Sequence, residues 1–509
     1  MLTALILIPL IGALLISFVK SGNTARNLAL ATAGVAFIWT IWLLSQFDLS
    51  NHGLQFSEYL PWADAIGLSY SLGTDGLSTP LLALNAFLTG IVIYSSPANI
   101  VRSRLYYALI LLVNAGVAGA FLAQNLLLFV LFFELELIPI YLLIAIWGGE
   151  KRGYAGMKFL LYTALSGILI LAAFLGVVFL SGSLNFDYDS LASQNLSPRA
   201  QLILLTLLLV GLGIKIPLVP LHTWSPDAYV EASPPIAILL GGILAKLGTY
   251  GLIRFGVQMF PQTWSVVAPG LAVIGAISVM YGSLSAIAQQ DIKRMVAYSS
   301  IGHMGYILVA AAAGTELSIL GAVAQMVAHG LILALLFNLV GIVESKVGTR
   351  ELSLLNGLMN PIRGLPLVSG LLITAGMASA GIPGLVGFAA EFIVFQGSFP
   401  IFPIPTLICI LSSGLTAVYF VILLNRTCFG KLDNDLAYYD RLTWAERVPA
   451  LILTVTLFYF GLQPNALIRW MQPTATAIAS TLPPTPELIA QTPQPITVLS
   501  QNEPRMNHR

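Results

Sequence analysis

Apolar runs long enough to cross a bilayer as helices recur along almost the whole chain of 509 residues. Hydrophobic residues make up 57% of the sequence and charged residues only 9%, whereas a soluble domain carries about 25% charged residues. Inside a bilayer every backbone polar group must be satisfied within the protein, and a helix does this by itself. The sequence therefore predicts an all-α polytopic membrane protein.

A spanning helix needs about 20 apolar residues, and by that rule the chain contains about fourteen predicted transmembrane helices. The first lacks the preceding basic residues of a cleaved signal peptide, so we expect it to be retained. The last is short, and the stretch after it, rich in proline, threonine and glutamine, is expected to be an extended or disordered tail. The predicted helices are 2–19, 27–45, 77–96, 105–121, 126–148, 159–180, 201–221, 234–256, 265–288, 296–314, 317–343, 365–397, 403–427 and 448–463.

The loops between these helices alternate in charge. Basic residues collect on the cytoplasm-like side of a membrane protein, and here they follow the odd-numbered predicted helices. One loop of that set, which contains Asp227 and Glu231, has no lysine or arginine. The loops on the opposite side are acidic or neutral, as at Asp48, Asp75 and Glu316. The alternation predicts that both termini lie on the trans side.

Two predicted helices, the seventh and the twelfth, are interrupted by glycine and proline. The seventh contains Gly211, Gly213, Pro217 and Pro220, and the twelfth contains the run GIPGLVG at 381–387. Non-helical backbone at membrane depth survives only where it is buried in protein or lines a wet cavity. Matching interruptions in two halves of a chain indicate inverted repeats and a transport site. Kinking for packing is the alternative, because both residue types are common in spanning helices.

Four ionisable side chains lie in the middle of apolar runs: Glu134, Lys215, Lys246 and Glu391. A charge at bilayer depth costs about 2.5–3.5 kcal/mol, so such residues are functional candidates by default. Two carboxylates and two lysines on four different segments indicate a proton relay rather than a binding pocket. Glu136 lies two residues from Glu134 and cannot share its helix face. A structural ion pair is the alternative for both glutamates.

The two lysines are flanked by apolar residues and glycines for a full turn or more on each side. A membrane lysine usually extends to the bilayer surface, which suits Lys158 near a loop but not Lys246. A desolvated lysine holds its proton less tightly, and a nearby carboxylate has the opposite effect. Movement of such a carboxylate would switch the lysine between holding and releasing a proton.

Three histidines accompany these residues: His222, His303 and His329. Histidine titrates near neutrality and can relay protons in either direction, although a buried histidine is more often only hydrogen-bonded. His329 is the strongest candidate, because it lies mid-segment between the second lysine and the last glutamate in sequence order. His222 and Asp227, at the end of the seventh predicted helix, are candidates for a proton uptake point or a structural cap.

No redox or nucleotide chemistry is expected in this chain. Its two cysteines, Cys409 and Cys428, lack the ligand spacing of zinc, haem or iron–sulfur sites, and the histidines match no metal site. No strand–GxGxxG–helix unit is present to bind a dinucleotide. The net charge of +1 leaves no basic patch for nucleic acid. We therefore expect no cofactor, no metal and no nucleic acid bound to this chain.

Five stretches carry a resemblance to a known family and are long enough to be highly specific. Over about residues 75–465 the chain resembles the antiporter-like subunits of respiratory complex I, and most closely their chain-4 (M-type) subunit. The stretches are FELELIPIY (133–141), KIPLVPLHTWSPDA (215–228), DIKRMVAYSS (291–300), MVAHG (326–330) and GIPGLVGFAAEF (381–392).

The resemblance implies a fourteen-helix proton-translocating subunit with two inverted five-helix repeats and broken helices seven and twelve. It implies that Glu134 pairs with Lys215, and that Lys246 and His329 pass the proton to Glu391. Secondary members of the relay are Glu136, His222, Asp227 and His303. The implied units are 1–104 (three helices and a lumenal loop), 105–256 (first repeat), 257–430 (second repeat), 431–470 (last helix) and 471–509 (tail).

The chain departs from the family pattern at four positions. Relatives often have leucine, histidine, serine and histidine where this chain has Ser225, Tyr229, Gly302 and Gly348, so the proton uptake region is expected to differ in polarity. The ELELIP run and the GEKR loop at 149–152 resemble the cyanobacterial and plastid branch. Complexes of that branch reduce plastoquinone from ferredoxin in the thylakoid membrane, and some cyanobacterial variants are coupled to carbon dioxide uptake.

The leading hypothesis is a proton-pumping subunit of a type-I NADH dehydrogenase-like complex, a NAD(P)H- or ferredoxin-quinone oxidoreductase, that serves photosynthetic cyclic electron flow in a cyanobacterial thylakoid. The resemblance implies other membrane subunits as partners, with the quinone site and iron–sulfur clusters in those partners. A multisubunit sodium/proton antiporter shares these motifs and is the second hypothesis. A membrane scaffold that has lost transport is the third, and the loss of Glu134, Lys215 or Glu391 would favour it; none is lost.

Overall fold

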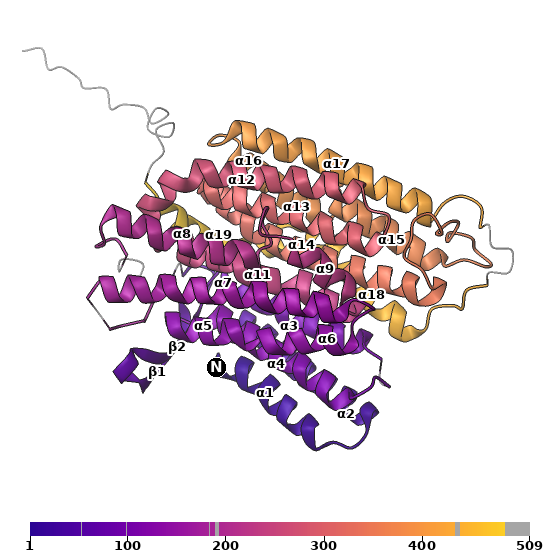
Figure 1. The fold of residues 1–509 in the computed structure, drawn as a ribbon, viewed down its shortest axis with the longest axis horizontal. Helices are drawn as coiled ribbons and strands as arrows, with labels where there is room; N and C mark the ends of the chain where they lie inside the picture. Colours follow the sequence, from indigo (N-terminus) through magenta and orange to yellow (C-terminus); the bar gives the residue numbers. More distant parts are fainter. Residues whose placement is uncertain (52, 98, 183, 189–192, 433–437, 484–509) are drawn as a thin grey trace, which may run out of the picture.

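The computed structural model describes residues 1–51, 53–97, 99–182, 184–188, 193–432 and 438–483. Their helices run side by side in one bundle (Figure 1). The prediction of an all-α membrane protein is confirmed, because twelve described helices are long and apolar enough to cross a membrane. The short helix α1 (Thr3–Phe18) and the broken pair α15 (Pro366–Ser379) and α16 (Val386–Ser398) match the other two predicted segments.

The first half of the chain adds a feature that the sequence did not predict, a two-stranded antiparallel hairpin between the second and third spans. Its strands are β1 (Gln55–Ala63) and β2 (Leu68–Thr74), joined by the short turn η1 (Asp64–Ile66), with Leu60 opposite Tyr70. The helices of this half are α2 (Gly22–Ser45), α3 (Ser78–Ser95), α4 (Ser103–Leu122), α5 (Leu126–Leu135), α6 (Leu137–Trp147), α7 (Arg152–Leu180), α8 (Pro198–Lys215), α9 (Trp224–Glu231), α10 (Pro234–Leu239), η2 (Leu240–Leu244), α11 (Ala245–Gly251) and η3 (Leu252–Val257).

The second half continues with long spans on either side of the α15/α16 break. Its remaining helices are α12 (Pro261–Ile287), α13 (Ile292–Ala313), α14 (Glu316–Val347), α17 (Pro403–Thr427), α18 (Trp444–Leu462) and α19 (Asn465–Thr481). Each break follows the longest helix of its half, α7 with 29 residues and α14 with 32. That correspondence is consistent with the two predicted repeats.

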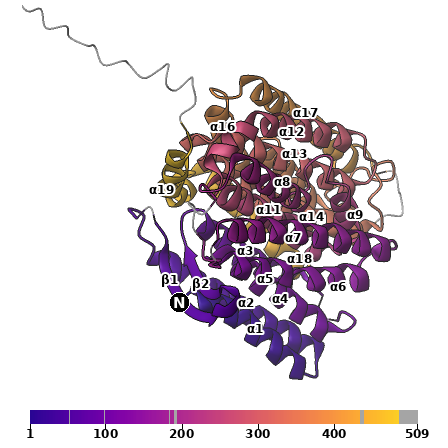
Figure 2. The same ribbon diagram turned by 60° about the vertical axis from the view of Figure 1, so that its left-hand side comes forward.

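The centre of the bundle is formed by the segments that are apolar on every side, as expected for helices without a solvent-facing stripe. Within the most apolar window of each, α14 and the continuous span from α10 to η3 are entirely buried. Figure 2 shows α11 and α14 near the middle of the bundle, with α1 and α17 at its outside. Of the buried ionisable residues described below, Lys246 and Arg254 lie on the span from α10 to η3, and His329 lies on α14.

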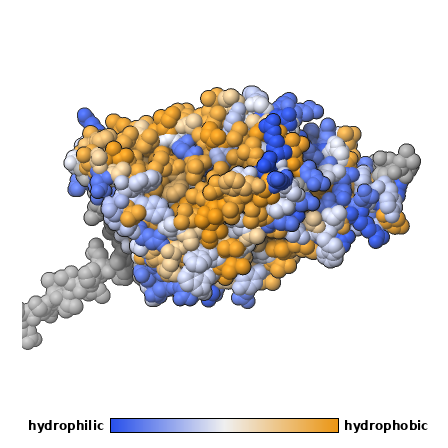
Figure 3. Space-filling view, turned by 90° about the horizontal axis from the view of Figure 1, so that it is seen from below, coloured by the Kyte–Doolittle hydropathy of each residue, from blue (hydrophilic) through white to orange (hydrophobic). Residues whose placement is uncertain are grey.

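The outer surface of the bundle is apolar. Figure 3 shows hydrophobic residues across the middle of one face. Large hydrophobic side chains are more than half exposed on several outer helices, for example Ile38 on α2, Leu161 on α7 and Leu411 on α17. An exposed apolar surface of this extent suits contact with lipid or with other membrane subunits.

The two predicted breaks are confirmed. The helix α8 ends at Lys215 and α9 begins at Trp224, and the intervening backbone includes Pro217 at a φ of 28°. Between α15 and α16 the chain turns through Gly381 and Gly384 at φ values of 67° and 92°, which favour glycine. Each break therefore stops one half-helix next to an ionisable residue.

The end of the chain differs from the prediction. The extended tail expected from residue 471 is wrong for residues 471–481, because α19 continues to Thr481. Buried Leu467, Met471 and Ile478 lie on one helical face of α19, which packs against α14. Pro473 within this helix masked the pattern in the sequence. The rest of the expected tail, 484–509, lies outside the described residues.

Helices α12 and α13 approach closely through glycines. A Cβ atom added at Gly282 would lie 2.5 Å from the backbone nitrogen of Gly302, and one added at Gly305 would lie 2.6 Å from the carbonyl oxygen of Gly275. Small residues permit such close packing of membrane helices, where dispersion contacts rather than water drive association. Gly270, which also lies on α12, has open space around it.

We therefore expect Gly282→Ala to destabilise the protein and Gly270→Ala to leave it unchanged or stabilise it. The added methyl group at 282 forces the backbones apart, at a cost of about 1–3 kcal/mol. At 270 only the helix preference of alanine remains, about 1 kcal/mol in favour of the variant. Thermal unfolding of the purified protein in detergent checks this. Equal unfolding temperatures for the two variants would contradict the close packing.

Candidate functional site

The first ionisable pair in the core joins Lys215 to Glu136. Lys215 is the last residue of α8, and Glu136 lies at the junction of α5 and α6. Their side chains form an ion pair with exposures of 2% and 0%. The Lys215 ammonium also lies 4.7 Å from the centre of the Phe133 ring, a favourable position for a cation over an aromatic face. Two charges so fully buried depend on each other, because either alone would be uncompensated.

In this structure Lys215 contacts Glu136 and not Glu134, the glutamate that was expected to pair with it. The helix turns by about 100° per residue, so carboxylates two apart point in different directions. Glu134 is partly exposed and faces α7, where a Cβ atom added at Gly167 would clash with its Oε1 atom. Which glutamate faced Lys215 depended on the break at Glu136, which the sequence did not reveal.

The second lysine, Lys246, is fully buried on α11 between the π-helical turns η2 and η3. Such turns are rare and are found frequently at functional sites. Its Nζ atom donates to the carbonyl oxygen of Gly241 at 2.5 Å and lies 2.8 Å from Nδ1 of His329 on α14. Glycines permit this approach, since a Cβ atom at Gly330 would lie 2.7 Å from the carbonyl oxygen of Gly242.

The contact between Lys246 and His329 constrains where a proton can be. Both nitrogens are basic, and a hydrogen bond between them needs one donor and one acceptor. If the lysine donates, Nδ1 of the histidine is unprotonated, and if Nδ1 carries the proton, the lysine must be a neutral amine. Two cations at 2.8 Å would repel each other strongly. The pair can therefore hold one excess proton, on either nitrogen, but not two.

The next step from His329 is an aromatic contact with His303 on α13. The two imidazole rings are stacked, with their centres 5.3 Å apart and their planes at 24°. The Nε2 atom of His329 is buried and has no hydrogen-bond partner among the described residues. A proton that reaches this atom lies beside the second histidine, so the two rings are neighbouring proton-binding groups.

His303 connects this stack to Glu391. Its Nδ1 atom lies 2.8 Å from the carbonyl oxygen of Ser299, and its Nε2 atom lies 3.2 Å from that of Ser379 and 3.5 Å from Oε1 of Glu391. Both ring nitrogens thus face oxygen acceptors, and either can carry a hydrogen-bonded proton. His303 was only a secondary candidate in the sequence, but it bridges the line.

The line ends at Glu391, in the second turn of α16 just after the helix break. Its Oε2 atom accepts a hydrogen bond of 2.9 Å from the hydroxyl of Ser413 on α17. A Cβ atom at Gly381, in the break, would lie 2.8 Å from the same oxygen. The carboxylate therefore lies at the point where backbone leaves the helix, and the serine, which the sequence did not single out, positions it.

These contacts join Lys246, His329, His303 and Glu391 into one line of titratable groups. In the described part of the chain no hydrogen bond or ion pair joins that line to Lys215. The two lysines are nonetheless on neighbouring elements, since a Cβ atom at Gly248 would lie 3.2 Å from Cβ of Lys215. The core thus holds two ionisable units side by side.

Two predicted secondary residues lie away from the line. Asp227 accepts from Lys158 on α7 at 2.8 Å and from Arg294 on α13 at 3.2 Å, so it ties three helices together beside the first break. His222 is buried against the ring of Tyr281, with 4.7 Å between ring centres. Its Nδ1 atom and the neighbouring Ser225 hydroxyl have no partner among the described residues.

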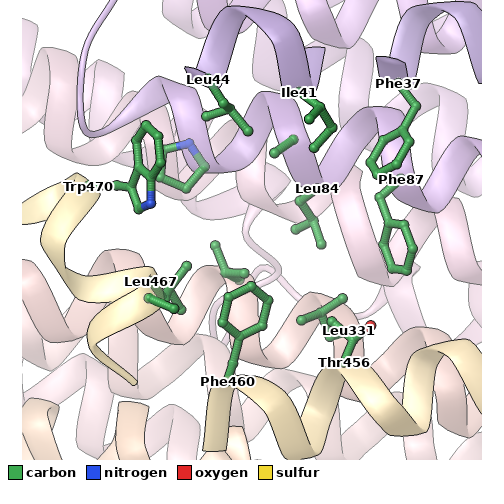
Figure 4. Close-up of a pocket in the computed structure, with 14 residues that line it drawn as sticks. Phe37, Ile41, Leu44, Leu84, Phe87, Leu331, Thr456, Phe460, Leu467 and Trp470 are labelled. Atoms are coloured by element: carbon green, nitrogen blue, oxygen red, sulfur yellow. The ribbon is translucent and has the colours of Figure 1, made fainter. Parts of the chain in front are cut away.

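An apolar cavity of about 290 Å³ lies apart from these charges, between α2, α3, α14, α18 and α19. Figure 4 shows side chains such as Phe37, Phe87, Phe460 and Trp470 around it. Thr456 is its polar contributor, so the cavity offers no titratable group for chemistry. In the described ranges no three residues among histidine, cysteine, aspartate and glutamate gather as metal ligands would.

The sequence matches the family of NADH:quinone oxidoreductase and Mrp antiporter transmembrane proteins over residues 123–416. A curated relative, NAD(P)H-quinone oxidoreductase chain 4 1 of Thermosynechococcus vestitus, is 38% identical over 99% of this chain and 98% of its own length. The chain 4 protein of Gloeobacter violaceus is 36% identical over 98% of this chain and 96% of its own.

Two solved structures share the fold. A chain of respiratory complex I from Thermus thermophilus is 28% identical and superposes with a TM-score of 0.85 over 95% of this chain and all of that chain. A chain of the Mrp complex from Dietzia sp. is 22% identical and has a TM-score of 0.84 over 95% of this chain and 99% of its own.

The buried pair predicts a specific rescue. Lys215→Met alone leaves a buried carboxylate without its partner, at a cost of about 3–5 kcal/mol. Adding Glu136→Gln should recover most of that loss, whereas adding Glu134→Gln should not. The midpoint of thermal unfolding of the three variants in detergent checks this. Recovery with Glu134→Gln instead would show that the other glutamate faces the lysine.

Proposed function

The chain belongs to the NADH:quinone oxidoreductase/Mrp antiporter transmembrane family, and from that premise we propose that it is a proton-translocating membrane subunit of a complex I-type, quinone-reducing complex. The observation that carries this proposal is the buried line from Lys246 through His329 and His303 to Glu391. The relatives named NAD(P)H-quinone oxidoreductase chain 4 supply the class of complex.

In this proposal the proton moves along a line of neighbouring titratable groups. A proton on Lys246 passes to Nδ1 of His329 across the 2.8 Å contact. Among the described residues no hydrogen bond joins Nε2 of His329 to His303, so a water molecule would carry the proton between the two rings before it passes from Nε2 of His303 to Glu391. The break before α16 provides the point at which Glu391 exchanges its proton with water.

The Glu136–Lys215 pair is the proposed control on that line. Both side chains are almost fully buried, so separating the two charges raises the free energy of the protein. The state with the ion pair formed is therefore stable, and the state with the charges apart stores energy. Electron transfer in the partner subunits would separate the two charges. Their separation would change the electric field at Lys246, which lies on a neighbouring helix. Glu134, which lies beside α7, is proposed as the carboxylate that receives Lys215 when the pair opens.

The finer proposal is a complex that passes electrons from ferredoxin to plastoquinone in a cyanobacterial thylakoid membrane, in the variant coupled to carbon dioxide uptake. The cyanobacterial relatives support the branch. The altered uptake region supports the variant, since Tyr229 is buried beside Trp224 and Phe337 where relatives often have a second histidine. Other membrane subunits of such a complex are the proposed partners, and they hold the quinone site and iron–sulfur clusters.

The proposed relay predicts loss of proton transfer without loss of the complex. In membranes bearing Lys246→Met or Glu391→Gln, redox-driven proton uptake per electron should fall several-fold while native gels show the assembled complex. Glu316→Gln is the matched control, because this exposed acid lies at the start of α14 away from the line. If both variants assemble and pump normally, the buried charges are structural and the scaffold hypothesis gains support.

Ion dependence separates the proposal from a sodium/proton antiporter. Proton uptake driven by electron donors should persist when sodium is replaced by potassium, and a sodium gradient alone should move no protons. Reduced ferredoxin should serve as donor better than NADPH in the same membranes. Proton movement that needs sodium and ignores the donors would place the chain with the antiporters instead.

A further inference from the structure

A second buried ionic cluster lies beyond Lys246, toward the side of the acidic and neutral loops. It centres on Arg254 of η3 and Asp75, just before α3, both only 4% exposed. The guanidinium donates to Oδ2 of Asp75 at 2.6 Å, to Oε1 of Gln258 at 3.1 Å and to the hydroxyl of Tyr250 at 3.3 Å. Nothing in the relay uses these residues.

The position of the cluster relates it directly to the relay. Lys246 and Tyr250 lie four residues apart on α11 and so share a face, and Arg254 of the following turn η3 contacts the Tyr250 hydroxyl. Arg254 therefore lies further along the span than Lys246, toward the loop side. A proton on Lys246 that moved straight on would therefore meet Tyr250 and then Arg254 before the loop side.

None of the groups on this face can take that proton and pass it on. Arginine does not lose its proton in proteins. The Tyr250 hydroxyl donates to the carbonyl oxygen of Phe121 at 3.2 Å. The Oδ1 atom of Asp75 accepts from the backbone nitrogens of Leu77 and Ser78 at 3.0 and 3.1 Å, while Oδ2 holds the guanidinium. A fixed guanidinium also repels an approaching proton, as arginines do in selective pores.

We propose that this cluster is a plug that stops protons held at Lys246 from leaking to the loop side, so that they leave only through His329 and Glu391. The inference rests on the proposed function. It assigns to Arg254 and Asp75 the role of blocking proton movement from Lys246 toward the loop side. The cluster also joins the start of α3 to η3, and a purely structural tether is the outcome that the experiment must separate from a plug.

The test is passive proton leak, measured as the decay of an imposed pH gradient in sealed vesicles that contain the assembled complex and no electron donor. The double variant Arg254→Ala with Asp75→Asn keeps the site neutral and leaves space that water can fill. It should speed the decay several-fold. Arg254→Lys, which retains a cation there, should keep the vesicles tight.

A third substitution shows where the leaking protons pass. Adding Lys246→Met to the double variant should return the decay to that of the unaltered complex, because the leak starts at this lysine. Lys346→Gln is the control for loss of a partly buried lysine–glutamate pair on the opposite side, and it should leave the decay unchanged. If the double variant fails to assemble, Arg254→Gln with Asp75→Asn fills more of the space and is expected to leak as well.

Tight vesicles from an assembled double variant would overturn the plug, and a lower yield of complex with tight vesicles would assign the cluster to tethering alone. A leak that persists after Lys246→Met would also contradict it, because the protons would then take another route. Failure of the plug is distinguishable from failure of the proposed function, because the leak is measured without an electron donor. That function fails if Lys246→Met or Glu391→Gln leaves redox-driven pumping intact, whatever the passive leak.

Discussion

The structure depends on one unusual burial, a lysine at the centre of the bundle that has a histidine rather than a carboxylate as its partner. Lys246 has no exposed surface, and in the described part of the chain its Nζ atom is hydrogen-bonded to the Gly241 carbonyl and to the His329 ring. A charge held there is poorly compensated. A side chain with that property is of little use for stability and is well suited to transfer.

Much of the local architecture follows from placing that lysine. The π-helical turns η2 and η3 bracket it, and Gly242 and Gly330 bring α14 close enough for His329 to reach its nitrogen. The paired charges elsewhere have the opposite character. Glu136 with Lys215 and Asp75 with Arg254 are buried with their partners in contact, so they resist change and can hold or block a proton path.

The sequence predicted those parts of this arrangement that carry a free-energy cost in a bilayer. Lys246 and Glu391 stood out as charges in apolar runs, and glycine with proline indicated both helix breaks. Buried charges and broken helices are unfavourable in a bilayer, so their presence indicates a function. It did not predict contacts that depend on how helices turn toward each other. The junction at Glu136 decided which glutamate reached Lys215, and the packing of α13 on α14 gave His303 its central position. The helix α19 was missed because its apolar face is narrow and contains Pro473.

The most direct test of the relay is the infrared difference spectrum of the assembled complex between its oxidised and reduced states. If the proton line ends at Glu391, turnover changes the protonation of that carboxyl group, and the spectrum contains a carboxyl C=O band that disappears in Glu391→Gln. The same band should shift in His303→Asn, because that ring lies 3.5 Å from the carboxylate. Identical spectra from the unaltered complex and both variants would contradict the account.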